Sequence, residues 1–182
     1  MPPNVAAPPS FWQRQRSAEV HLPSLAPIAL PVMQFLTLTT CPSEWIHHDL
    51  YIFRDESVTF YVGQSDCAFA RVWTHLHDGF KGRSLVGKFI RNNWPRAMRF
   101  TIELIRTDAP EFQPIQFNRD DAERILIVAL RPCFNNTHNA APTALPVHYA
   151  SPNKTVVYPR NMGKMMREAD HAFRREQSAS TW

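Results

Sequence analysis

The chain has 182 residues, of which 44% are hydrophobic and 12% aromatic, and its formal net charge is +4. This composition excludes a disordered chain and suffices for one ordinary core, so we expect one domain with decorated ends. The mild basic excess fits a nucleic-acid partner without requiring one.

The sequence shows no mark of secretion or of a membrane span. Its three cysteines, Cys41, Cys67 and Cys133, share no short spacing, so neither a disulfide framework nor a metal knuckle is indicated. The apolar run at residues 30–38 is broken by Pro31 and is too short to cross a bilayer. We therefore expect a cytoplasmic protein with no membrane partner.

Prolines recur throughout residues 1–43, which we predict to be an N-terminal extension without a long secondary-structure element. Within it, residues 11–20 have the pattern of a short helix, and the apolar run at 32–39 is expected to pack on the core. The functional domain is predicted to span residues 44–136, and residues 137–182 form a C-terminal extension.

The first regular elements are two predicted strands, at residues 50–53 and 58–62, on either side of a polar turn. A loop at residues 55–57 would place Tyr51 directly across from Tyr61, with both phenols on one face of the hairpin. A loop one residue longer or shorter would put them on opposite faces.

Helices are predicted next at residues 66–77 and 85–92, with Ser65 or Asp66 capping the first and Ser84 the second. A strand at 98–105 and a helix at 121–130, ended by Pro132, complete the domain. The order β-β-α-α-β-α predicts an α+β fold, with a small three-stranded antiparallel sheet flanked by helices.

The C-terminal extension contains one more predicted helix, at residues 163–175, in which basic residues lie beside apolar ones. Such a helix can follow a nucleic-acid backbone. It can equally be a solvated helix that docks on the core through Met165 and Met166. The residues leave both readings open.

Groups that could carry chemistry fall at regular spacing around Gly63. Arg71 follows Gly63 by eight residues and His75 follows Arg71 by four, so the guanidinium and the imidazole share one helical face. A glycine at this bend lets a backbone or a phosphate come close. A plain alternative exists, in which Arg71 and His75 are ordinary residues on the surface of a helix.

Two later residues also have plain explanations when each is taken alone. Glu123 would close a capping box that begins at Asp120, and its side chain would then only satisfy a backbone N–H group. Asn135, just after Pro132, would be a loop residue that bonds its own turn. A divalent cation such as Mg²⁺, however, prefers carboxylate oxygen, so Glu123 is also a candidate metal ligand.

The joint order of these residues resembles the GIY-YIG nuclease family. The family pattern has a tyrosine on the first strand, Tyr-Ile/Val-Gly on the second, an arginine eight residues on and often a histidine one turn later. A glutamate on a later helix and an asparagine after a proline follow. The family's first Gly-Ile-Tyr is Asp49-Leu50-Tyr51 here, so its glycine is absent. The other counterparts are Tyr61-Val62-Gly63, Arg71, His75, Glu123 and Asn135, and the resemblance spans residues 50–136.

This resemblance implies a metal-dependent endonuclease that hydrolyses DNA phosphodiester bonds with one Mg²⁺ or Mn²⁺ per active site. Glu123 would bind the metal. Tyr51, helped by His75, would take the proton of the attacking water, and nearby positive charge would have to lower its pKa. Arg71 would supply that charge and stabilise the reacting phosphate.

The remaining roles follow from the same resemblance. Tyr61 would orient water or phosphate, and Asn135 would hold the site together through hydrogen bonds and contact the phosphate. A homodimer would allow both strands of a palindrome to be cut. Residues expected to contact substrate are Gly63, Gln64, Ser65, Lys81 and Arg83.

The enzyme could be of a restriction, phage or repair type, and the sequence does not choose between DNA and RNA. A runner-up hypothesis is a catalytically inactive nucleic-acid-binding module with the same fold. A third is a mixed α/β protein whose match to the pattern is accidental. The third predicts that Tyr51, Tyr61, Arg71 and Glu123 do not converge in space.

Overall fold

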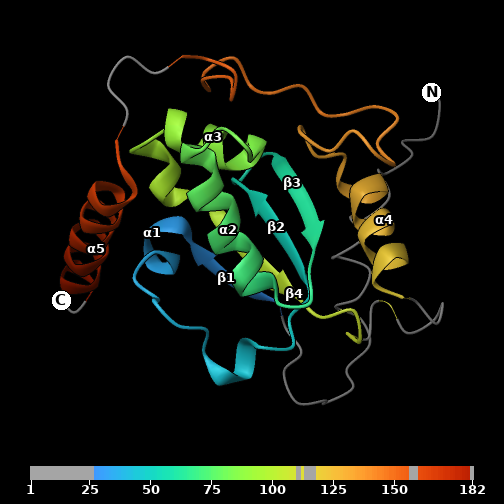
Figure 1. The fold of residues 1–182 in the computed structure, drawn as a ribbon, viewed down its shortest axis with the longest axis horizontal. Coiled ribbons are helices and arrows are strands. Elements are labelled where there is room, and N and C mark those ends of the chain that lie inside the picture. Colours follow the sequence, from blue (N-terminus) through green and yellow to red (C-terminus); the bar gives the residue numbers. More distant parts are fainter. Residues whose placement is uncertain (1–26, 110–111, 113–117, 156–159, 181–182) are drawn as a thin grey trace, which may run out of the picture.

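The structure is a computed structural model that describes residues 27–109, 112, 118–155 and 160–180, so the helix predicted at residues 11–20 lies outside the described residues. The described residues form an α+β fold with helices on both faces of an antiparallel sheet (Figure 1). Its strands are β1 (Ile28–Pro31), β2 (Leu50–Arg54), β3 (Thr59–Gln64) and β4 (Thr101–Ile105). Its helices are α1 (Val32–Phe35), α2 (Ala68–Phe80), α3 (Leu85–Asn92), α4 (Arg119–Leu130) and α5 (Met162–Ala179), with 3₁₀ turns η2 (Ser43–Trp45) and η3 (Arg96–Arg99).

The sheet has four strands in the order β1-β4-β2-β3, so the expected three-stranded sheet is wrong by one strand. The additional strand, β1, comes from the proline-rich segment at residues 1–43. It pairs with β4 from Ile28 opposite Leu104 to Pro31 opposite Thr101. Recurrent prolines exclude a long or central strand, but a proline is tolerated at the end of a short edge strand. The N-terminal segment therefore completes the sheet.

The helices match the sequence pattern well where the capping residue is unambiguous. α3 begins and ends as predicted, and Ser84 Oγ accepts a hydrogen bond from Gly87 N at 3.0 Å. α2 begins later than predicted, after Cys67, which makes no side-chain capping bond. Neither Ser65 nor Asp66 caps α2, because the helix begins only after Cys67, and Ser65 Oγ accepts a hydrogen bond from Cys67 N at 3.4 Å.

The β2–β3 hairpin places Tyr51 across from Gly63 and Tyr61 across from Phe53. The expected direct pairing of the two phenols is wrong by two residues. The turn places Arg54 across from Thr59 instead of Val58, and the register shifts by one more residue between Phe53 and Arg54. Tyr51 and Tyr61 nevertheless lie on one face, since alternate residues along a strand point to the same side. The prediction that they share a face is confirmed.

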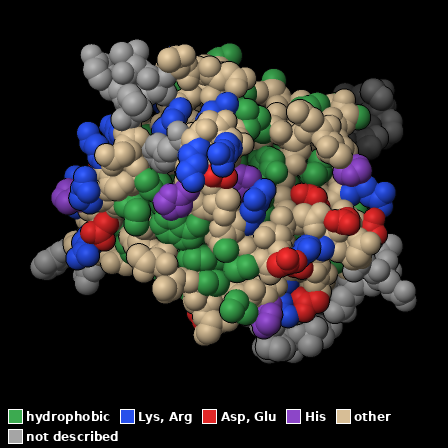
Figure 2. Space-filling view, in the orientation of Figure 1, with side chains coloured by type: hydrophobic (Ala, Val, Ile, Leu, Met, Phe, Trp, Pro, Cys, Tyr) green, Lys and Arg blue, Asp and Glu red, His purple; other side chains and the backbone are tan. Residues whose placement is uncertain are grey.

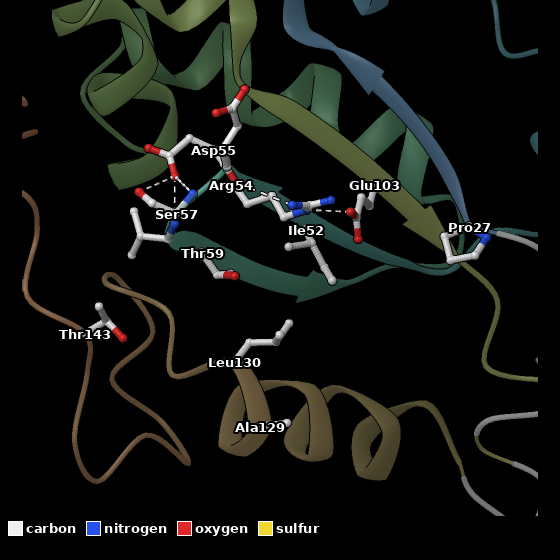
Figure 3. Close-up of a pocket in the computed structure, with 12 residues that line it drawn as sticks. Pro27, Ile52, Arg54, Asp55, Ser57, Thr59, Glu103, Ala129, Leu130 and Thr143 are labelled. Carbon is white, nitrogen blue, oxygen red and sulfur yellow. Dashed lines mark hydrogen bonds and ion pairs between the residues drawn. The ribbon is translucent and has the colours of Figure 1, made fainter. Parts of the chain in front are cut away.

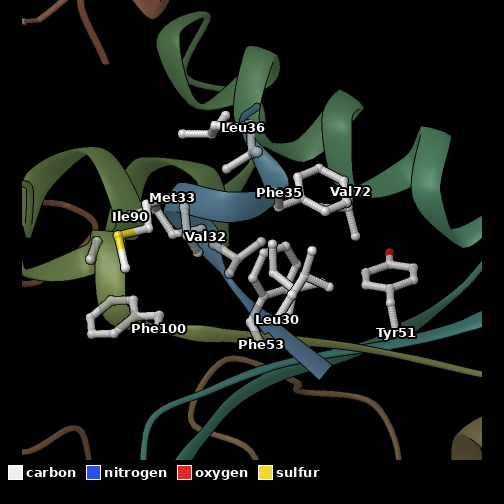
Figure 4. Close-up of a cluster of buried hydrophobic side chains, with 14 of the residues drawn as sticks. Leu30, Val32, Met33, Phe35, Leu36, Tyr51, Phe53, Val72, Ile90 and Phe100 are labelled. Atoms are coloured by element: carbon white, nitrogen blue, oxygen red, sulfur yellow. The ribbon is translucent and has the colours of Figure 1, made fainter. Parts of the chain in front are cut away.

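The two faces of the sheet have separate cores. α1, α2 and α3 cover one face, and Figure 4 shows Tyr51 at the margin of this core with its hydroxyl directed toward α2. α4 lies alongside β3 and covers the other face (Figure 1). Residues that alternate with Tyr51 along β2, namely Leu50 and Ile52, point into this second core.

α5 lies against α1, on the far side of the molecule from α4 (Figure 1). It extends the predicted helix at both ends and docks through the buried side chains of Met165 and Ala169, while Lys164 and Arg167 are exposed. Docking through methionine is therefore confirmed, and contact with a nucleic acid stays a prediction. Within the described part of the chain, no helix has the length and apolar character that crossing a membrane requires.

Candidate active site

A buried phenol and a buried imidazole form the centre of the candidate site. Tyr51 Oη lies 2.7 Å from His75 Nε2, and the two residues are 1% and 9% exposed. Tyr61 completes the cluster, with its ring centre 6.2 Å from that of Tyr51 and 5.4 Å from that of His75. The alternative of a surface histidine is therefore wrong, because His75 points from α2 toward the sheet.

Gly63 makes room for Tyr51. A Cβ atom placed on Gly63 would lie 2.3 Å from Tyr51 Oη and 2.4 Å from Tyr51 Cζ, distances at which atoms overlap. The expected close approach is thus made by a phenol ring from the paired strand. This gives Gly63 a packing role, and contact with substrate stays a prediction.

Arg71 is exposed on α2, one turn before His75. Burial raises the pKa of Tyr51, the neighbouring Tyr61 adds to the increase, and the hydrogen-bonded Arg71 guanidinium offsets part of it. Positive charge was expected to lower the pKa of Tyr51, and this is wrong for the net shift, because the pKa is raised. The cost of placing a phenolate in the core exceeds the benefit of one partly solvated cation.

Glu123 lies near the start of α4 and is half-buried. It is not a capping residue, because the helix begins at Arg119 and Asn118 Oδ1 accepts the capping hydrogen bond from Asp121 N at 2.9 Å. The capping-box explanation is thus wrong, since α4 starts two residues earlier than predicted. Glu123 Oε2 instead accepts a hydrogen bond from Gln64 Nε2 at 3.0 Å.

Gln64 joins the end of β3 to the first turn of α4. Its Nε2 donates to Asp120 Oδ1 as well as to Glu123, and its Oε1 accepts from Arg119 Nε at 2.8 Å. Gln64 therefore orients the carboxylate, a role that differs from the predicted substrate contact. Sequence reasoning missed Arg119 and Asp120, because no local pattern shows that this turn meets β3.

Electrostatic effects connect Glu123 with the phenol cluster. Burial raises the pKa of Tyr61, the Glu123 carboxylate raises it further, and Arg71 lowers it. Glu123 also contributes to the raised pKa of Tyr51. The charges of Arg71 and Glu123 thus both act on the two phenols.

Asn135 holds β3 in place from outside the sheet. Its side chain is bonded at both polar ends to one residue, since Oδ1 accepts from Val62 N at 2.9 Å and Nδ2 donates to Val62 O at 2.8 Å. Asn135 is buried. It therefore fixes the strand that carries Tyr61 and Gly63, and the expected contact with phosphate stays a prediction.

The other predicted substrate residues lie around this centre with different surroundings. Ser65 is half-buried where the chain leaves β3, and its Oγ accepts from Cys67 N at 3.4 Å. Lys81 and Arg83 are exposed on the turn between α2 and α3, and Lys81 Nζ lies 3.9 Å from Asp78 Oδ1. Both side chains are thus exposed at the surface, where a polyanion could reach them.

A cavity of about 640 Å³ lies on the opposite face of the sheet from Tyr51. Figure 3 shows it between the β2–β3 hairpin and α4, with the Arg54–Glu103 ion pair on its wall and Leu130 facing it. None of the predicted site residues lines this cavity. Tyr51 and His75 therefore lie on the other side of the sheet, whereas Glu123 of α4 meets Gln64 at the end of β3.

The carboxylates near Gln64 fit a hard divalent cation. Asp120 and Glu123 both accept a hydrogen bond from the same nitrogen, Gln64 Nε2, so the two carboxylates lie side by side. Among the described residues, no three His, Cys, Asp or Glu side chains are grouped as a ligand set. Mg²⁺ keeps several waters and needs one or two carboxylates plus substrate phosphate, so this small donor set is adequate for it.

Comparisons of the chain with protein-family models, with curated proteins and with solved structures find no match. The resemblance stated above is therefore carried by the residues named here and by their geometry.

Acid is expected to destabilise the protein through His75. Burial and the Arg71 charge lower the pKa of His75 from its ordinary value of 6.5 to about 4, although Asp78 acts in the opposite direction. Between these values the unfolded chain binds a proton that the folded chain does not. The stabilisation is therefore fully present above about pH 6.5 and is lost as the pH falls toward 4. Over this range the free energy of unfolding should fall by about 3 kcal/mol.

This pH dependence can be measured by urea unfolding at pH 7 and pH 4.5 in the wild type and in His75→Gln. Because glutamine does not titrate, the His75→Gln protein should lose about 2–3 kcal/mol less stability than the wild type between pH 7 and pH 4.5. The carboxylates contribute equally to both proteins and cancel in the comparison. Equal losses in the two proteins would show that His75 titrates normally in the folded state.

Proposed function

We propose that this chain is a metal-dependent endonuclease of the GIY-YIG type, which hydrolyses phosphodiester bonds in DNA. The observation that carries the proposal is the hydrogen-bonded pair of Tyr51 and His75, with Arg71, Tyr61 and Glu123 around it. The order of β2, β3, α2, α3, β4 and α4 agrees with the arrangement that the family resemblance implies. The strand β1 is an addition to that arrangement.

The pair provides a route for the proton of an attacking water. Because burial raises the pKa of Tyr51, a free phenolate is not available at neutral pH. Tyr51 can act without one if the water proton passes to Tyr51 Oη while the phenol proton passes to His75 Nε2. His75 is neutral at pH 7, since its pKa is about 4, so this nitrogen can accept the proton.

Arg71 and Tyr61 would act on the phosphate. A guanidinium offers several N–H donors in a fixed plane, which suits the extra negative charge that develops when water adds to phosphorus. Arg71 is exposed and therefore accessible to a strand of DNA. The half-buried Tyr61 is acted on by the charges of both Arg71 and Glu123, and its hydroxyl would orient water or phosphate.

Glu123, with Asp120 beside it, would hold one Mg²⁺ or Mn²⁺. A bound divalent cation polarises the phosphate and stabilises the departing oxygen. Burial raises the pKa of Glu123, and the hydrogen bond from Gln64 acts against this shift and favours the charged form. Gln64 thus keeps the carboxylate oriented.

The surface around α2 and α3 is suited to a polyanion. Figure 2 shows Lys and Arg side chains gathered on the face over α3 and the C-terminal end of α2. Lys81 and Arg83 lie on the turn between these helices. Such cations would bind the DNA backbone without reading its sequence, and their contribution would weaken as salt is added.

The proposal is tested with supercoiled plasmid incubated with the protein in Mg²⁺, Mn²⁺ or EDTA. We expect nicked and linear products with either metal and none with EDTA. Arg71→Ala should abolish cleavage. Arg99→Ala is the control and should still cleave, because Arg99 is an exposed arginine that pairs with Glu176 at 2.7 Å. Binding of the plasmid without cleavage would favour the inactive nucleic-acid-binding module instead.

A further inference from the structure

Ser84 occupies the side of the His75 ring that faces away from Tyr51. Its Oγ lies 2.8 Å from His75 Nδ1 and also accepts the capping hydrogen bond from Gly87 N at 3.0 Å. Ser84 is 6% exposed, so solvent does not compete for the imidazole nitrogen. The imidazole is therefore held between two hydroxyl groups, one on each nitrogen.

The hydrogens of this chain can be assigned from the partners present. Tyr51 Oη and His75 Nε2 lie 2.7 Å apart, and the phenol, as the more acidic of the two groups, is the donor between them. Of the groups beside Tyr51, His75 Nε2 is a stronger base than the hydroxyl of Tyr61. The phenol thus donates to Nε2, which leaves the imidazole hydrogen on Nδ1, directed at Ser84 Oγ.

We propose that Ser84 is a positioning residue that fixes the tautomer of His75, so that an unprotonated Nε2 faces Tyr51. A hydroxyl oxygen has two lone pairs, and Ser84 Oγ uses one for Gly87 N–H and the other for His75 Nδ1–H. The consequence for catalysis rests on the proposed function, because the relay requires that Nε2 be free to accept a proton. The tautomer itself does not depend on that function.

The packing of α2 on α3 supports this assignment. A Cβ atom on Gly87 would lie 2.0 Å from His75 O, and a Cβ atom on Gly79 would lie 2.4 Å from Gly87 C. Two glycines thus let the helices approach until Ser84 reaches the ring. The sequence indicates Ser84 as a helix cap and gives no sign of this second contact.

The first test is the tautomer, read from the imidazole ¹⁵N chemical shifts of ¹⁵N-histidine-labelled protein at pH 7, with His75 assigned by its loss in His75→Gln. We expect a protonated Nδ1 and an unprotonated Nε2 in the wild type and in Ser84→Thr, and a mixed or reversed tautomer in Ser84→Ala. A wild-type His75 with hydrogen on Nε2, or a tautomer unchanged by Ser84→Ala, overturns the proposal.

The second test is cleavage kinetics with the same variants. Ser84→Ala should lower kcat by about 10- to 100-fold with little change in KM, and Ser84→Thr should restore it. Asn161→Ala is the control for lost capping, because Asn161 Oδ1 accepts from Lys164 N at 2.8 Å on α5, and it should change neither readout. A lower kcat with an unchanged tautomer overturns the proposal. A wild type that binds but does not cut DNA overturns the proposed function, and the ¹⁵N shifts still decide the role of Ser84.

Discussion

Glu123→Gln is expected to lower metal-dependent DNA cleavage by at least about 10³-fold, while the free energy of unfolding changes by less than about 1 kcal/mol. Gln has nearly the same shape and can still accept the hydrogen bond that Gln64 Nε2 donates to this position. It lacks the negative charge that a hard cation requires. Burial raises the pKa of Glu123, so loss of this charge does not weaken the fold.

The measurement compares plasmid cleavage over a range of Mg²⁺ and Mn²⁺ concentrations with urea unfolding of the same preparations. Asp121→Asn is the matched control, since it makes the same chemical change on the same helix. Asp121 pairs with Arg124 at 2.7 Å on the outside of α4, and exposed pairs contribute little to stability. Wild-type cleavage by Glu123→Gln would exclude this carboxylate as the metal ligand.

The elements set by local patterns could be predicted from the sequence. The sequence bounds α3 by the capping residue Ser84 at one end and by Pro95 beyond the other, and the structure agrees. The shared face of Tyr51 and Tyr61 could be predicted because side chains alternate along a strand. A pairing error of two residues therefore leaves both phenols on the same face. Spacing along α2 likewise placed Arg71 and His75 together.

The contacts that complete the site depend on tertiary packing and left no local signal. The bond from Gln64 to Glu123 requires α4 to meet the end of β3, and these residues are far apart in the chain. The raised pKa of Tyr51 follows from how deeply its ring is buried, which residue type and spacing do not determine. β1 escaped prediction because a four-residue edge strand carries too little pattern to outweigh its prolines.

Gly63→Ala is expected to reduce both stability and cleavage, because the added methyl group would occupy the position of the Tyr51 ring. The overlap at 2.3 Å involves a side chain that is 1% exposed, so the ring can move only by disturbing the core. Overpacking of this kind costs about 1–3 kcal/mol. The displaced Tyr51 Oη would also lose its 2.7 Å contact with His75 Nε2, so cleavage should fall by about 10²-fold or more.

A double-mutant cycle in urea separates this clash from a general effect of alanine in a strand. In a Tyr51→Leu background the outer part of the ring is absent, so Gly63→Ala should cost much less than it does in the wild type. Gly163→Ala is the control, because the nearest atom to its Cβ would lie 3.5 Å away, and it should leave stability and cleavage near wild type. If the costs of Gly63→Ala and Tyr51→Leu simply add, then Gly63 is not there to accommodate the phenol. The close pairing of Gly63 with Tyr51 would then have no part in holding the hydroxyl against His75.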